Sequence, residues 1–431
     1  MPIRIYLSES LVGNPILYYT LQLIAFNKGF SFLFIDNVNE ADIIIDDNSN
    51  SSISLCLPFY QYLCIQDFNA VNRLAQGSYY FIASNGRKDY LASIFYLVNC
   101  LQEYNSNSKD KYERYSYSGS FQKKEETLQI NLVQELIEKF WNSHSILPKN
   151  SLQSRKSSFF LTHDIDTIYG SKNQNGDYAL KSNKWGKIPR LLWNHYIGKP
   201  DWLNMNEIMA LEESYKFKST FYWLVRNDKK NADYNIHEPI IRNQLNAIKA
   251  RGFEIGLHKS MQQATFSQEL NELGEEVVGQ RYHFLKFTIP EAWQAIEQSG
   301  LKLDSSLGFS EDYGFRNSYG LPFMPFNLVT NKVYDFIEVP MQIMDRTFFN
   351  QHKPIVQIEK ELIDWLDKNK YNTVITINFH NNFFDKLLYA GYEQAYETIL
   401  KYFKEEGLLP MLQTDLIREF YQPQLFNKST A

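Results

Sequence analysis

The chain has 431 residues, of which 44% are hydrophobic and 22% charged, a balance that excludes a mostly disordered protein. The formal net charge is −5 and no basic region stands out, so nucleic acid is not expected as a partner. The three cysteines, Cys56, Cys64 and Cys100, are odd in number and lack CxxC spacing. They predict neither a disulfide framework nor a cysteine metal site, and they favour a reducing compartment.

The first residues do not have the pattern of a signal peptide, because Glu9, Asn14 and Pro15 interrupt the apolar run. No stretch of about 18 apolar residues occurs anywhere, so no transmembrane segment is expected. Together with the unpaired cysteines, these features predict a cytoplasmic protein. Nothing in the sequence indicates its oligomeric state.

Residues 1–104 alternate short apolar runs with helical patterns, which predicts a small α/β domain. This domain carries no glycine-rich phosphate loop and no cluster of histidines or acids, so its role is unknown beyond packing against the rest of the chain. Strands are expected at 3–7, 32–35 and 41–45, and helices at 15–27 and 91–104.

Residues 105–150 are expected to form a linker and a connecting helix, since polar residues dominate up to 127 and a helical pattern runs over 130–143. In residues 151–431, strand and helix patterns alternate, which predicts a parallel sheet, open or closed into a barrel. Strands are expected at 158–161, 219–225, 253–257, 336–343, 373–379 and 408–412. Helices are expected at 204–215, 239–250, 268–277, 290–299, 355–369 and 392–406.

Unusual polar residues follow three of these strands. Asp164 and Asp166 follow the first, His258 follows the third and His380 follows the fifth. Because the carboxyl ends of the strands carry the active site in α/β barrels, two acids and two histidines are expected on one rim.

The spacing of Asp164 and Asp166 favours a metal site. Two ionised acids two residues apart would repel each other unless a cation lies between them. With a metal, one acid ligates and the other accepts a proton from metal-bound water. The pair could also cap a turn. His258 is a suitable ligand for Zn²⁺, Co²⁺ or Ni²⁺.

His380 is followed by two asparagines, a polar setting that suits a general acid, although a histidine held by a loop carbonyl would also fit. Arg281 near Asp164 would keep that acid ionised, and Asp345 near His380 would hold an imidazolium. Either charged residue could instead form a surface salt bridge.

These motifs together resemble the polysaccharide deacetylase (NodB homology) family over residues 157–416. The family has the motifs T-F-D-D, H-[ST]-x-x-H and R-x-P-Y, a later Asp motif and a final L-x-H. Residues 162–166 resemble the first in a spaced D-x-D form, 254–260 the second, Arg281 the third, Asp345 the fourth and 378–380 the last. Residues 304–309 and 314–316 resemble the subgroup with an extra N-terminal α/β domain, which is associated with surface-polysaccharide synthesis.

The resemblance implies a distorted (β/α)7 TIM-like barrel, preceded by the small α/β domain, and metal-dependent removal of an acetyl group from a sugar. Asp164 would be the general base and Arg281 would orient it. His380 would protonate the leaving amine, tuned by Asp345. A divalent metal, zinc before cobalt or nickel, would bind Asp166 and His258. The acetylated sugar or glycan, and whether its acetyl is N- or O-linked, are not specified.

The sequence departs from the family at the second metal histidine, whose position is Gln262, a weak amide ligand. The third ligand is therefore expected to be His283, which lies two residues after Arg281. His163 and Gln262 itself are the alternatives, although His163 adjoins Asp164 and should point the other way on a strand.

Two other functions fit the same residues. One is an allantoinase-like or other linear or cyclic amide hydrolase on the same barrel. The other is a non-catalytic glycan-binding homologue that has lost a metal ligand.

Overall fold

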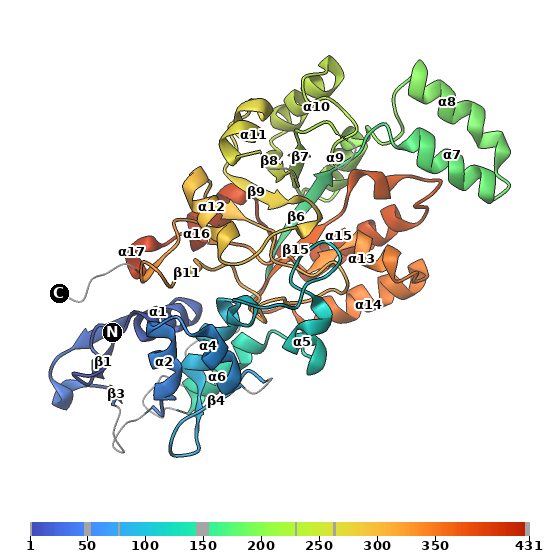
Figure 1. Cartoon of the computed structure of the whole chain (residues 1–431). Coiled ribbons are helices and arrows are strands. Elements are labelled where there is room, and N and C mark those ends of the chain that lie inside the picture. Colours follow the sequence, from blue (N-terminus) through green and yellow to red (C-terminus); the bar gives the residue numbers. More distant parts are fainter. Residues whose placement is uncertain are drawn as a thin grey trace.

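The computed structural model describes residues 2–46, 53–75, 78–143, 155–228, 231–261 and 264–426. Within these ranges, no helix is both long enough and apolar enough to cross a membrane. Figure 1 shows a smaller N-terminal unit, drawn in blue, beside a larger unit in which helices surround a sheet.

The N-terminal unit is built on a three-stranded parallel sheet in the order β2-β1-β3. Helix α1 begins after Asn14, whose side chain accepts two backbone N–H groups, and ends at Gly29 in the left-handed conformation. The buried helix α4 packs between α1 and α6. The bounds are β1 Ile3–Leu7, α1 Pro15–Lys28, β2 Phe32–Ile35, β3 Ile43–Ile45, α2 Leu57–Cys64, α3 Phe68–Ala75, α4 Tyr90–Val98 and α6 Leu132–Asn142.

Several buried contacts join the N-terminal unit to the rest of the chain. The Tyr19 hydroxyl donates to the carbonyl of Met324 at 2.9 Å. Arg316 and Glu103 form a buried ion pair at 2.7 Å, with both side chains 2% exposed. Because an unpaired charge at such a depth is costly, this pair fixes the two units together.

The larger unit contains eight parallel strands in the order β13-β10-β9-β8-β7-β6-β15-β14, curled into a half-barrel that is consistent with a TIM-like fold. The edge strands β13 and β14 are joined by only four residues, and β16 (Leu409–Pro410) pairs with the start of β6. The bounds are β6 Ser158–Ile165, β7 Thr220–Leu224, β8 Glu254–Lys259, β9 Gly279–Tyr282, β10 Leu303–Asp304, β13 Ile337–Glu338, β14 Ile343–Met344 and β15 Val374–Asn378.

Helices cover the outside of this sheet (Figure 1). They are α9 Met205–Ser214, α10 Pro239–Ala250, α11 Phe266–Leu273, α12 Glu291–Ser299, α14 Ile355–Lys368, α15 Tyr392–Glu406 and α16 Gln413–Phe420. Each of the six helices predicted in this region is present, with ends that differ by a few residues.

The strands differ from the prediction in three ways. β6 and β8 extend beyond their apolar runs, so that Asp164 and His258 lie inside strands. The predicted strand over 336–343 is two short strands, β13 and β14, on opposite edges of the sheet. β9 and β10 were not expected, because the β9 sequence GQRY has no apolar pattern and β10 has only two residues. The buried Arg281 of β9 is accommodated by polar partners.

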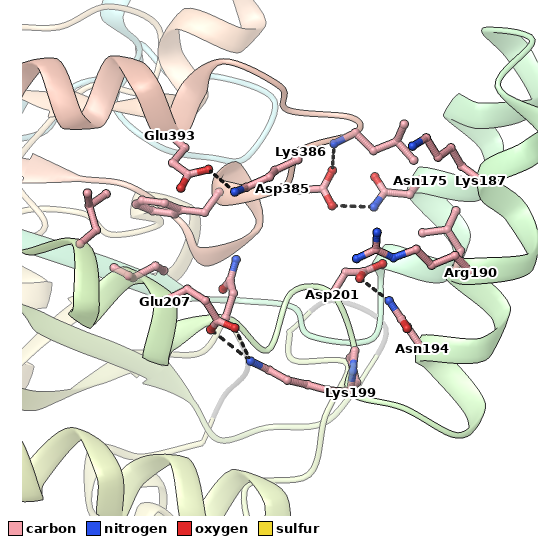
Figure 2. Close-up of a pocket in the computed structure, with 17 residues that line it drawn as sticks. Asn175, Lys187, Arg190, Asn194, Lys199, Asp201, Glu207, Asp385, Lys386 and Glu393 are labelled. Atoms are coloured by element: carbon pink, nitrogen blue, oxygen red, sulfur yellow. Dashed lines mark hydrogen bonds and ion pairs between the residues drawn. The ribbon is translucent and has the colours of Figure 1, made fainter.

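The connection from β6 to β7 contains a helical hairpin, α7 (Ser171–Lys181) and α8 (Ile188–Tyr196), which extends away from the barrel in Figure 1. A cavity of about 550 Å³ lies between this hairpin and the barrel. Hydrogen bonds from Asn175 to Asp385 and from Lys199 to Glu207, both at 2.8 Å, cross the cavity (Figure 2). These bonds hold the base of the hairpin to the barrel.

Candidate active site

All seven side chains predicted for the site meet at the carboxyl ends of the parallel strands. The pairing of β7 with β8 and of β8 with β9 places His258 beside Leu224 and Arg281. The seven residues are Asp164 in β6, Asp166 just after it, His258 in β8, Arg281 in β9, His283 just after it, Asp345 at the start of α13 (Asp345–Asn350) and His380 just after β15.

Asp166, His258 and His283 form a three-residue set that could hold a metal ion, with ligand atoms all within 4.8 Å of one another. The Nε2 atom of His258 lies 3.2 Å from Oδ1 of Asp166, and that of His283 lies 3.5 Å from Oδ2. His258 donates through Nδ1 to the carbonyl of Arg281 at 2.9 Å, and Nδ1 of His283 lies 3.3 Å from Oδ1 of Asn231. These outer contacts leave both Nε2 atoms facing the carboxylate.

The donor set fits a divalent cation. A carbonyl oxygen can only accept, so Nδ1 of His258 carries the hydrogen and its Nε2 presents a lone pair to Asp166. Oδ1 of Asp166 is buried and has no hydrogen-bond partner among the described residues. Two facing acceptors are unfavourable unless a cation lies between them, and two imidazoles with one carboxylate are common zinc ligands.

The charges around Asp166 support the same interpretation. Burial acts to raise the pKa of Asp166, but His283 and His258 outweigh it and hold that pKa well below its usual range. Burial lowers the pKa of His283, which favours the neutral, ligating form of this imidazole. Burial also acts to lower the pKa of His258, but Asp164 and Asp166 outweigh it and raise that pKa, so a cation, either a proton or a metal, is favoured between His258 and the carboxylates.

Asp164 is held by two donors, one on each carboxylate oxygen. Arg281 donates to Oδ1 at 2.9 Å and the Asn378 amide donates to Oδ2 at 2.9 Å. The fully buried Arg281 also donates to the hydroxyl of Thr162 and the carbonyl of Ser305, at 2.8 and 2.7 Å. Burial would raise the pKa of Asp164, but Arg281 and the nearby histidines lower it overall, so the carboxylate stays ionised.

His380 approaches the carboxylates from the neighbouring strand. Its Nε2 lies 4.0 Å from Oδ2 of Asp164 and 3.7 Å from Oδ2 of Asp166. Its Nδ1 donates to Asp345 at 2.7 Å, so a carboxylate rather than a loop carbonyl holds the ring. Burial opposes protonation, but Asp345 outweighs it, and the pKa of His380 is raised to about 9.

The alternative third ligands do not join the set. His163 points to the opposite face of β6, as strand alternation requires, and its ring nitrogens contact the Phe379 carbonyl at 2.8 Å and Glu212 at 2.9 Å. Both of its ring nitrogens are thus engaged on the far side of β6, and His163 is not part of the set with Asp166. Gln262 lies outside the described residues.

An aromatic pair at the rim was not expected. The rings of Tyr112 and Phe284 stack with centroids 5.8 Å apart, beside a cavity of about 500 Å³ that reaches His283 and His380. Tyr112 comes from the segment predicted to be a linker, which Arg114 ties to the rim by donating to the Phe284 carbonyl at 2.6 Å. Neither aromatic residue lies in a recognisable motif, so no sequence signal could have paired them.

Residues 11–145 match the model of a family of unknown function, DUF7033, and no curated protein matches the chain. A putative polysaccharide deacetylase from Mycobacterium smegmatis is 13% identical, over 65% of this chain and 96% of its own, with a TM-score of 0.39. PuuE allantoinase is 13% identical, over 60% and 89%, with a TM-score of 0.38. A CE4 family pseudoenzyme from Bacillus anthracis is 11% identical, over 63% and 68%, with a TM-score of 0.30. At these TM-scores the neighbours do not establish a function, which depends on the side chains of the site.

Proposed function

We propose that this protein is a metal-dependent carbohydrate deacetylase, which hydrolyses the N-acetyl or O-acetyl group of a sugar in surface-polysaccharide metabolism. The observation that carries the proposal is the pairing of an ionised acid with a protonated base around one Asp-His-His set. Asp164 is kept ionised by Arg281, and His380 is kept protonated by Asp345. Acyl transfer to water needs both groups, one to accept a proton and one to donate it.

Asp166, His258 and His283 would hold the divalent metal, with zinc as the first choice. When bound there, such a metal supplies Lewis-acid polarisation of the acyl carbonyl and lowers the pKa of a coordinated water. These three residues form a complete set of protein ligands without Gln262. This disfavours the alternative in which the protein is a non-catalytic homologue that has lost a metal ligand.

The remaining side chains supply proton transfer and orientation. Asp164 accepts the proton of the attacking water, and Arg281 and Asn378 fix the direction of its carboxylate. His380 delivers a proton through Nε2 to the leaving nitrogen or oxygen, so that the tetrahedral intermediate breaks towards products. Asp345 stabilises the imidazolium before transfer and orients its ring.

The cavity supports a sugar as the substrate. Its volume of about 500 Å³ lies within the range of small-ligand sites. The Tyr112 and Phe284 rings offer flat apolar surfaces on which a sugar ring can stack, while Asn231 and Asn382 line the same cavity and can bind its hydroxyl groups. We place this activity in the cytoplasm, in line with the reducing compartment favoured by the cysteines.

The proposal is tested by acetate release from a substrate panel. Zinc-loaded protein should release acetate from at least one N-acetylated or O-acetylated sugar and leave cyclic amides such as allantoin intact. The matched control is Asp164→Asn, which should bind zinc normally and lose activity by about 10²–10⁴-fold. Hydrolysis of cyclic amides without acetate release would assign the site to an allantoinase-like reaction instead.

A further inference from the structure

The α7–α8 hairpin carries large apolar side chains on its outer surface. Trp185 and Trp193 are 60% and 59% exposed, and Tyr196 and Ile197 are 69% and 67% exposed. The other five tryptophans of the chain are all at most 3% exposed. Since isolated exposed aromatics are ordinary but a group of them on one element is not, this surface indicates an interaction site.

On α8 the exposed apolar residues share one helical face. Leu192 and Tyr196 are four residues apart, as are Trp193 and Ile197, so their side chains lie in two adjacent rows. The buried Leu191 lies on the opposite side, towards the barrel. A helix that turns an apolar stripe outward needs a partner to cover that stripe.

The charge of the hairpin is opposite to that of the chain. Residues 171–199 contain six Lys or Arg and one Asp, whereas the whole chain has a net charge of −5. Within the described part of the chain, Lys184, Lys187 and Arg190 form no ion pair. Basic residues beside exposed tryptophan, tyrosine and isoleucine are typical of helices that lie in the interface of an anionic bilayer.

The base of the hairpin reaches the active site. Thr167 and Gln174, at its beginning, line the cavity that contains Asp166 and His380. The bonds from Asn175 to Asp385 and from Lys199 to Glu207 tie the hairpin to the barrel (Figure 2). A partner bound to the hairpin would therefore lie at a fixed position relative to this cavity.

We propose that the α7–α8 hairpin docks the protein onto an anionic lipid bilayer. Trp185, Trp193, Tyr196 and Ile197 enter the interfacial region, while Lys184 and Lys187 contact acidic headgroups. The charge of the hairpin favours a bilayer over a second copy of the same hairpin, since six cations facing six cations would repel. If the proposed deacetylase function holds, docking would present sugars linked to membrane lipids to the cavity.

The test uses the full-length protein and vesicles of phosphatidylcholine alone or with 30% phosphatidylglycerol. The protein should co-sediment with the anionic vesicles, bind neutral ones at least tenfold more weakly, and dissociate as salt is raised. Because only Trp185 and Trp193 are exposed, bilayer entry should shift the tryptophan emission to shorter wavelength, and brominated lipids should quench it.

Two double variants separate the apolar and the basic contributions. Trp185→Ser with Trp193→Ser, and Lys184→Glu with Lys187→Glu, should each weaken binding to anionic vesicles by roughly tenfold or more. The controls change exposed residues elsewhere, Tyr371→Ser and Lys332→Glu, and should bind as the wild type does. Hydrolysis of a soluble acetylated sugar should be unchanged in all four, so that loss of docking is distinguished from loss of the active site.

Three results would overturn the proposal. The first is the absence of binding to anionic vesicles at low salt. The second is an equal loss of binding in the control variants. The third is self-association in solution that Trp193→Ser abolishes, because a second copy of the chain would then cover the apolar face.

Discussion

Asp345 binds His380 twice, through one carboxylate oxygen to the backbone N–H at 2.6 Å and through the other to Nδ1 at 2.7 Å. This double contact fixes the ring so that Nε2 faces the carboxylates of Asp164 and Asp166. It also raises the pKa of His380 to about 9, despite burial. His380 is therefore positively charged at neutral pH and able to donate a proton.

The first prediction concerns this pair. In Asp345→Asn the carboxylate charge is lost, so the pKa of His380 should fall towards its unperturbed value of about 6.5. A general acid works only while protonated, so wild-type activity should decline as pH rises through about 9. In the variant the decline should begin at lower pH. The pH profile of kcat measures this shift. If activity declined at the same pH in the variant and the wild type, Asp345 would not control the protonation of His380.

The second prediction concerns proton delivery by His380. His380→Ala should retain fold and metal but lower kcat by about 10²–10⁴-fold on ordinary acetamido sugars. An activated acetyl ester should be largely spared, because its leaving group departs without a proton. Parallel assays on both substrates measure the difference. Equal losses on the two would leave His380 with an orienting role only.

The third prediction concerns metal retention. His258→Ala should remove one of two imidazole ligands and abolish stoichiometric zinc binding. Because His258 is buried and hydrogen-bonded to the Arg281 carbonyl, the variant should also be less stable, so zinc is measured on protein that is shown to be folded. The matched control is His237→Ala, an exposed histidine outside the site, which should keep its zinc. Elemental analysis of both proteins, purified without chelator or histidine tag, makes the measurement. An unchanged zinc content in His258→Ala would show that the metal binds at another site.

The fourth prediction concerns His163, which adjoins Asp164 in the sequence but points away from the site. His163 is buried against Glu212, whose carboxylate also accepts a hydrogen bond from Tyr396. His163→Ala should therefore leave a cavity and a poorly paired carboxylate, lowering the free energy of unfolding by about 2–4 kcal/mol. Denaturant unfolding should show this loss while the zinc affinity of the folded protein stays normal. A normal stability with reduced zinc affinity would reverse the assignment.

The positions of Asp164, His258 and His380 could be predicted because strand-like patterns at 158–161, 253–257 and 373–379 precede them. The alternation of side chains along a strand also predicted correctly that His163 points away from the site. The sequence did not locate β9 or β10 and merged β13 and β14 into one strand, because β9 lacks an apolar pattern and the other three strands contain two residues each. Arg281 and Asp345 were therefore identified only by their resemblance to the family motifs.

Other features of the site depend entirely on tertiary structure. Asn378 was recognised only as part of a motif, and its hydrogen bond to Asp164 follows from the pairing of β15 with β6. Tyr112 and Phe284 are far apart in the sequence, and the loop that brings them together has no regular secondary-structure pattern. The third ligand was narrowed to three residues by sequence, and the geometry favours His283.

The proposed deacetylase activity requires one divalent metal on Asp166, His258 and His283. Its most direct test is a zinc titration of metal-free protein, with acetate release from an acetylated sugar followed at each addition. Acetate release should rise from near zero and level off at one zinc per chain. Release that is already complete without metal, or zinc that binds at one equivalent without any acetate released from any acetylated sugar, would contradict the claim.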